Sequence, residues 1–115
     1  MMGYQIRLAN DGAVCKVDAH EEGGTYIMGG SPEAELSMTY NYSQVYALLD
    51  WHPAKMDGRK ALTCIPELET VVEKLGTKQY AKDYWAPTPG NAGHAMNIVL
   101  GWCRQHPKAK VEVSV

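Results

Sequence analysis

The spacing of hydrophobic residues changes twice along this chain of 115 residues, and the change limits the folds that it can adopt. Up to about residue 40, apolar residues alternate with polar ones, which is the period of half-buried β-strands. They then recur at three- and four-residue steps to about residue 105, as in amphipathic helices. Residues 111–115 alternate again. Because strands and helices are segregated, we expect an α+β fold in the order ββββαααβ. An antiparallel sheet of about five strands would carry about three helices on one face.

The first forty residues are expected to form two β-hairpins. Residues 4–8 and 13–17 flank Asn10-Asp11-Gly12, in which glycine accepts a positive φ without steric cost. A second hairpin is expected to pair residues 25–28 with residues 34–40. The alternation places Leu36, Met38 and Tyr40 on one face of that last strand and Glu35, Ser37 and Thr39 on the other.

Helix signals follow the hairpins. Ser43 is a suitable N-cap for the first helix, which is expected to end at His52-Pro53 because a residue before proline avoids the α region. The second helix is expected over residues 63–75, with Pro66 in its first turn and Gly76 as the residue that ends it.

The longest helix is expected over residues 89–105. Thr88 is the predicted N-cap, and Pro89 occupies the favoured first helical position. Its apolar stripe consists of Ala92, Ala95, Met96, Val99 and Cys103. Residues 111–115 then form the last strand, which would join the two ends of the chain if it pairs within the sheet.

Length and composition indicate one globular domain over residues 1–115, with 45% hydrophobic and 21% charged residues. The net charge of −2 argues against general nucleic-acid binding, which usually needs a basic protein. The cysteines are Cys15, Cys64 and Cys103, an odd number at wide spacings that predicts no disulfide framework and a reducing compartment. With neither a signal peptide nor a membrane span in the pattern, we expect a cytoplasmic protein without a membrane partner.

Two expected helix starts carry the residues best suited to binding. A helix N-terminus presents unpaired N–H groups that attract anions, glycine allows close approach, and tyrosine or tryptophan stacks on flat groups. We therefore hypothesise a pocket for a nucleotide-like anion where the starts of the first and third helices meet. The predicted ligand-binding residues are Tyr40, Asn41, Tyr42, Ser43, Tyr84, Trp85, Thr88, Gly90, Asn91 and His94. The structural alternative is that both segments only cap their helices.

No catalytic residue, cofactor or metal ion is assigned from the sequence. His94 is suited to acid–base chemistry or to a buried structural role, and a hydrolytic pair with Asp83 is a hypothesis. Cys103 and His106 lie three residues apart, but two ligands do not make a metal site. Glu21, Glu22, Glu33 and Glu35 are interpreted as a solvated acidic edge.

Three separated motifs resemble a group of small, uncharacterised proteins encoded by bacteriophages and by bacteria that carry prophage-like DNA. The motifs are Gly-Gly-Thr-Tyr at residues 23–26, Thr-Tyr-Asn-Tyr-Ser at residues 39–43 and DYWAPTPGNA at residues 83–92. The chain departs from the group at its end, VEVSV, where the group has an acidic tail with a tryptophan. The resemblance covers most of the chain and implies an intracellular accessory protein made during phage or prophage growth, but it implies little about activity. Small phage proteins of this size commonly bind a host component, such as an immune enzyme or an immune nucleotide signal, and we expect the same here by analogy.

Three functions follow from these observations, and binding is favoured over catalysis. The first is a phage-type accessory protein that binds a nucleotide-like small molecule at the helix starts of Asn41 and Asn91. The alternative is a counter-defence protein that inhibits a host protein through an acidic protein–protein surface, as anti-CRISPR proteins do. The third is a small hydrolase that uses His94 and Asp83. A homodimer through an exposed aromatic patch or a free sheet edge is a further expectation.

Overall fold

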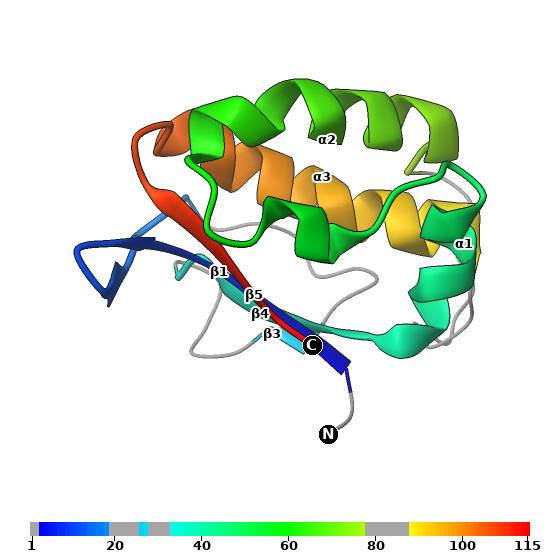
Figure 1. The fold of residues 1–115 in the computed structure, drawn as a ribbon, viewed down its shortest axis with the longest axis horizontal. Coiled ribbons are helices and arrows are strands. Elements are labelled where there is room, and N and C mark those ends of the chain that lie inside the picture. The colour runs from blue at the N-terminus through cyan, green and yellow to red at the C-terminus, as the bar shows by residue number, and fades with distance from the viewer. Residues whose placement is uncertain (1–2, 19–25, 28–32, 78–87) are drawn as a thin grey trace.

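The computed structural model of the chain describes residues 3–18, 26–27, 33–77 and 88–115. In these residues, helices pack on one face of an antiparallel sheet, so the expected α+β class is confirmed (Figure 1). The helical layer is two helices deep, because α3 lies on the sheet and α2 lies on α3 (Figure 1). Tyr84, Trp85 and Asp83 fall outside the described residues.

The sheet is organised around β1, which pairs with three other strands. Residues 3–7 of β1 pair with β4 and residues 5–9 pair with β5, while its end forms a hairpin with β2. The strand β3 pairs with β4, as the second expected hairpin requires. The five strands are β1 (Gly3–Asn10), β2 (Ala13–Val14), β3 (Tyr26–Ile27), β4 (Glu35–Thr39) and β5 (Lys110–Ser114).

Turn chemistry at the first hairpin is as predicted. Asp11 has a φ of 52° and Gly12 a φ of 82°. Positive φ at both central residues is the requirement of the two-residue turn whose twist matches that of paired strands. The second strand is shorter than expected, although the Cys15 N–H still donates to the Leu8 carbonyl at 2.9 Å.

Burial on β4 differs from the half-buried alternation of its sequence. Leu36 and Met38 are fully buried as expected, but Ser37 and Thr39 on the opposite face are also buried. The Ser37 hydroxyl donates to the Tyr4 carbonyl at 3.4 Å, which compensates in part for its loss of water. Short polar side chains are compatible with burial when backbone groups lie within reach, so alternation alone did not indicate that both faces are covered.

The C-terminal strand β5 is paired on both sides. One side pairs with β1, which confirms that the two ends of the chain meet in the sheet. On its other side, the Gly58 N–H donates to the Val111 carbonyl at 2.8 Å, and the Val111 N–H donates to the Arg59 carbonyl at 2.9 Å. The Val113 N–H donates to a carboxylate oxygen of Asp57 at 2.9 Å. These bonds protect an edge that would otherwise accept another strand.

The first helix begins earlier and ends sooner than predicted. A short 3-10 helix, η1 (Tyr40–Tyr42), precedes α1 (Ser43–Ala47). Thr39 is the N-cap of η1, and its hydroxyl accepts from the Asn41 N–H at 3.1 Å. The N-cap position of α1 is Tyr42, so the prediction of Ser43 as N-cap was wrong. Ser43 has helical dihedral angles, which an N-cap does not have. A positive φ of 52° at Asp50 turns the chain before His52.

The helix α2 (Ala61–Leu75) begins two residues before the predicted start. The Ala61 N–H donates to the Ala109 carbonyl and the Leu62 N–H donates to the Pro107 carbonyl, so the turn before β5 satisfies the first free donors of the helix. Pro66 therefore lies inside the helix, and its predicted place in the first turn was wrong. Gly76 ends the helix with a φ of 72°, as expected.

The helix α3 (Pro89–Gln105) has the predicted bounds. The Thr88 hydroxyl accepts from the Asn91 N–H at 3.1 Å, which confirms the N-cap. Every residue of its predicted apolar stripe is buried, and further residues are buried as well because α2 covers the side that the sheet does not. The buried residues are Gly90, Asn91, Ala92, Gly93, Ala95, Met96, Ile98, Val99, Leu100, Trp102 and Cys103.

The helices α2 and α3 meet backbone to backbone at a pair of glycines. A Cβ atom built on Gly93 would lie 1.9 Å from the carbonyl oxygen of Gly76 and 3.0 Å from the Leu75 Cβ. Gly76 itself needs a positive φ, which side chains disfavour. No side chain separates the two helices at this point, so their crossing depends on glycine at both positions.

We expect Gly93→Ala to lower the free energy of unfolding by about 2–3 kcal/mol, because the new methyl group meets a backbone oxygen that cannot turn away. Gly101→Ala on the same helix is the control, since its Cβ would have no atom within 4 Å. It should be neutral or stabilise by up to about 1 kcal/mol through helix propensity. Urea unfolding at constant m-value measures both variants, and equal midpoints would contradict the close crossing.

Candidate functional site

A polar and aromatic cluster joins β1 to the segment around α1. The Tyr4 hydroxyl contacts the Ser43 hydroxyl and lies 2.9 Å from His52 Nε2. The rings of Tyr40 and His52 pack edge-on against the Tyr4 ring, with centroid distances of 4.9 and 5.3 Å. Two predicted binding residues, Tyr40 and Ser43, therefore lie together, with Tyr4 and His52 as partners that the sequence did not reveal.

The hydrogen bonds in this cluster have a defined direction. The Ala54 N–H donates to His52 Nδ1 at 3.0 Å, so the proton of a neutral imidazole lies on Nε2. That Nε2–H donates to the Tyr4 oxygen, and the Tyr4 O–H is then the donor to Ser43. Because the Ser43 hydroxyl accepts this hydrogen bond rather than donating it to a base, the chain of hydrogen bonds does not activate Ser43 as a nucleophile. Its role is to hold η1, α1 and the loop before η2 (Pro53–Met56) on the sheet.

We expect Tyr4→Phe to cost about 1–3 kcal/mol of unfolding free energy, because His52 and Ser43 lose their shared partner in a partly buried place. Tyr40→Phe is the matched control, because its ring contact with Tyr4 is kept and the residue is only partly buried. Chemical denaturation followed by circular dichroism compares the two. Equal losses would contradict the assigned bonds.

The start of α3 lies close to α1 but does not present its polar residues in the way that the sequence suggested. The Tyr46 hydroxyl donates to the Ala92 carbonyl at 3.0 Å, which joins the two elements. Asn91 is 1% exposed and Tyr42 is fully buried, whereas Asn41 is exposed. Gly90 is also buried.

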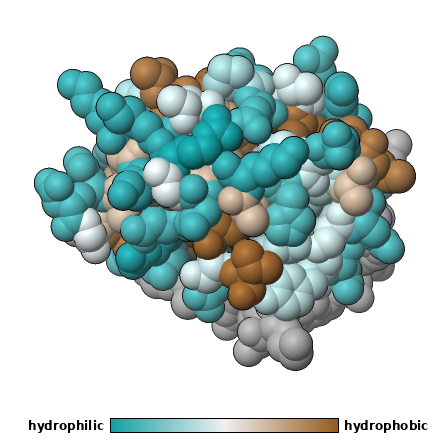
Figure 2. Space-filling view, viewed as in Figure 1, coloured by the Kyte–Doolittle hydropathy of each residue, from teal (hydrophilic) through white to brown (hydrophobic). Residues whose placement is uncertain are grey.

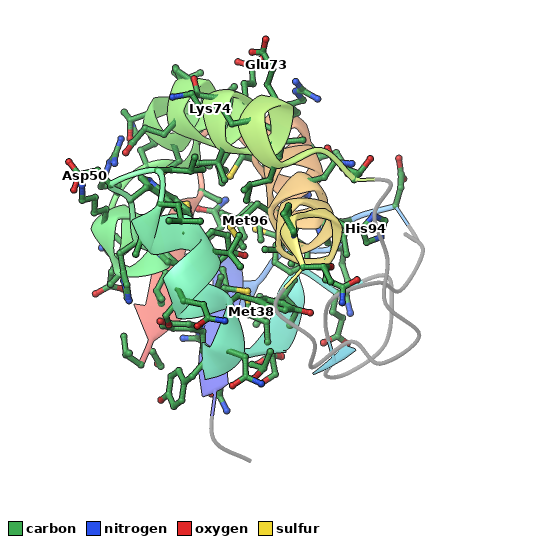
Figure 3. All side chains as sticks on the ribbon, turned by 90° about the vertical axis from the view of Figure 1, so that its right-hand side faces the viewer. Met38, Asp50, Glu73, Lys74, His94 and Met96 are labelled. Carbon is green, nitrogen blue, oxygen red and sulfur yellow. The ribbon has the colours of Figure 1, made fainter. Side chains whose placement is uncertain are left out.

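His94 lies on a different side of α3 from the side that faces the core. Figure 3 shows His94 on the side of α3 away from α1, and Met38 and Met96 inside, between the sheet and the helices. Both methionines are fully buried. The described residues thus bring together the two helix starts through Tyr46, while the pocket that Tyr84 and Trp85 were expected to complete stays a prediction.

A groove opens between the loop that follows α1 and one face of α2. Its volume is about 430 Å³. One wall is the segment from Leu49 to Lys55, and the other is the α2 face from Pro66 to Lys74. We call it the Trp51 groove, and its lining residues are Leu49, Asp50, Trp51, Lys55, Pro66, Glu67, Thr70, Val71 and Lys74. The sequence pattern of this loop indicated only the end of a helix.

Glu67 on α2 connects the two walls of the groove through Trp51, and it also forms an ion pair with Arg59. Glu67 also accepts from the Trp51 indole N–H at 3.3 Å, and the Arg59 guanidinium donates to the Thr63 carbonyl at 2.7 Å. Trp51 is 8% exposed, and its ring packs edge-on against Tyr46. Burial raises the pKa of Tyr46 well above its ordinary value, so this hydroxyl stays protonated. The groove is therefore shaped before any ligand arrives.

Two charged side chains at the rim are not engaged by the rest of the described chain. Asp50 and Lys74 are exposed and form no ion pair among the described residues. Lys55 donates to the Asp50 carbonyl at 3.2 Å and keeps further N–H donors. The groove thus offers cations and the carboxylate of Asp50, and Leu49, Trp51 and Val71 add apolar side chains to its lining.

The three cysteines do not provide reactive thiolates. All three are free and buried, and burial raises the pKa of each thiol, with Cys103 at about 12. The neighbouring Cys64 adds to the shift of Cys103. Because the folded state favours the protonated thiol, the contribution of Cys103 to stability is complete below about pH 9 and declines as the pH rises toward 12. Among the described residues, no group of three or more His, Cys, Asp or Glu side chains is arranged to hold a metal ion.

We expect the native protein to resist a thiol reagent such as dithionitrobenzoate at pH 8, because buried, protonated thiols are poor nucleophiles. Three thiols should react once the chain is unfolded in guanidinium chloride. The absorbance of the released thiolate counts them. Rapid reaction of one thiol in the native protein would show an accessible cysteine and contradict the burial.

Figure 2 shows apolar side chains as separate spots in a mostly hydrophilic face rather than as one patch. The large apolar residues with the highest exposure, Leu48, Leu62 and Val115, belong to different parts of the chain. None of the helices in the described part of the chain has the length and hydrophobicity that crossing a membrane requires. Comparison with known proteins finds no matching family model, no matching curated protein and no matching solved structure.

Proposed function

We propose that this protein is a small phage-type accessory protein that acts by binding a nucleotide-like anion, and that the ligand lies in the Trp51 groove. The observation that supports it is the groove itself. It is a hollow of about 430 Å³ whose lining includes apolar side chains and two lysines. Sites for small molecules typically have volumes of about 300–1,000 Å³, mostly apolar walls and a few polar groups that orient the ligand.

The lysines of the groove provide a place for an anionic group. Lys55 and Lys74 both line it, the negative charge of Glu67 is paired with Arg59, and Asp50 contributes one further carboxylate. Of the two lysines, Lys74 forms no ion pair among the described residues, and it lies at an exposed place near the end of α2. An ammonium group attracts phosphate as a point charge, so Lys74 is the residue from which an anion gains most.

The groove is a different place from the helix starts of Asn41 and Asn91. The described part of those starts holds buried side chains that join elements of the fold, which supports their structural reading. The phage-type origin rests on the sequence motifs alone. The alternative function is inhibition of a host protein, and native mass spectrometry distinguishes it from ligand binding.

Titration of ¹⁵N-labelled protein with nucleoside monophosphates tests this function. We expect shifts at the Trp51 indole and at the backbone of residues 49–51 and 70–74. Lys74→Gln should weaken binding about 10-fold or more, since it removes a charge-assisted contact. Lys108→Gln is the control, because Lys108 is exposed and lies outside the groove.

Two results would contradict the proposal. One is the absence of any shift at millimolar nucleotide, and the other is a set of shifts far from the groove that Lys74→Gln does not alter. Native mass spectrometry of the protein purified from expressing cells separates the alternatives. A co-purified small molecule supports binding in the groove, and a stoichiometric host protein in its place supports the inhibitor.

A further inference from the structure

We infer that Asp50 selects the base of the bound nucleotide, and that it favours a base with two adjacent N–H donors, as in guanine. The inference rests on the proposed function, because it assigns a specificity-determining residue to the same groove. It starts from the geometry of Asp50, which lines the groove opposite α2. Figure 3 shows Asp50 on the loop after α1 and Lys74 on α2, both at the outer edge of the helices.

The backbone of Asp50 is held from both sides. Its N–H donates to the Ala47 carbonyl at 3.0 Å, and its carbonyl accepts from the Lys55 ammonium at 3.2 Å. With a φ of 52°, it has a conformation that glycine adopts most easily and that aspartate tolerates. The fixed backbone leaves the exposed carboxylate as the part of Asp50 that can meet a ligand. Such backbone outliers concentrate at functional sites.

The lining of the groove combines groups of opposite chemistry. The carboxylate of Asp50 is an acceptor only, with two oxygens that can receive a pair of parallel N–H bonds. The ammonium groups of Lys74 and Lys55 are donors and attract an anion, and that of Lys55 is bound to the Asp50 carbonyl. Leu49, Trp51 and Val71 add apolar side chains to the same lining. A ligand that satisfies these groups has a flat body with adjacent N–H donors and also carries an anionic group.

A guanine nucleotide meets these requirements. Its N1–H and N2–H groups lie side by side and match the two oxygens of a carboxylate. The hydrogen-bonding edges of adenine and cytosine place an acceptor beside their amino group, which a carboxylate repels. Hypoxanthine keeps the N1–H but lacks the amino group. A volume of about 430 Å³ also favours a mononucleotide over a smaller zwitterion such as an amino acid.

Calorimetric titration of the protein with guanosine, inosine and adenosine 5′-monophosphates tests the inference. We expect guanosine monophosphate to bind about 10- to 100-fold more tightly than inosine monophosphate, which lacks one charge-assisted bond. Asp50→Asn should remove this difference and retain binding of all three nucleotides. Asparagine also tolerates positive φ, so the variant keeps the loop conformation.

Glu73→Gln is the matched control, because Glu73 is an exposed acid on α2 that does not line the Trp51 groove. It should leave the preference for guanine unchanged. Equal binding of the three nucleotides by the wild-type protein would overturn the role of Asp50 but leave the proposed function standing. Binding of none of them would overturn both. A preference that survives Asp50→Asn would place the selecting group elsewhere and overturn this inference.

Discussion

The position of α2 on α3 depends on a backbone contact, where a Cβ atom on Gly93 would collide with the carbonyl oxygen of Gly76. Side-chain packing tolerates small adjustments, whereas two backbones in direct contact have one separation and one crossing point. This contact places the end of α2, and therefore Lys74, relative to the buried helix beneath it. At its other end, α2 is tied to the turn before β5 through Ala61 and Leu62. With both ends held, α2 is a rigid wall against which the loop after α1 packs.

The second wall of the Trp51 groove owes its position to the core. Trp51 packs on Tyr46, and the Tyr46 hydroxyl bonds to the first turn of α3. The hydrogen bond from the Trp51 indole to Glu67 then joins this wall to α2. Glu67 is also paired with Arg59, whose carbonyl accepts from β5. The groove thus lies between the loop and α2, and both are connected to the rest of the fold. Because each wall is attached to the core by its own contacts, a ligand need not order either of them, and less binding free energy is lost on closing the site.

Local signals in the sequence predicted the parts of the fold that local chemistry determines. Thr88 and Pro89 indicated the start of α3, and the Asp11-Gly12 pair indicated the first turn. Predictions were wrong where contacts with residues distant in the sequence determine how a helix begins. Ser43 has the chemistry of an N-cap, yet Thr39 caps η1 and Ser43 meets Tyr4, which is 39 positions away. Pro66 lies inside α2 because carbonyls near β5 extend the helix toward its N-terminus. The groove escaped prediction for the same reason, since its two walls come from separate segments and neither carries a motif.

The most conspicuous motif of the sequence, PTPGNAG, is explained largely by the fold. Thr88 caps α3, Gly93 permits the helix crossing and Asn91 is buried, so the described residues of this segment serve stability. The residues proposed to meet a ligand, Asp50 and Lys74, are exposed and contribute little to the core. This separation has a physical consequence. Changes at the rim alter the charge that a ligand encounters without opening a cavity or breaking a buried hydrogen bond, which are the changes that unfold small proteins. Loss of binding in variants of Asp50 or Lys74 therefore indicates a change in ligand recognition. Substitutions in PTPGNAG are expected to change the stability of the fold first.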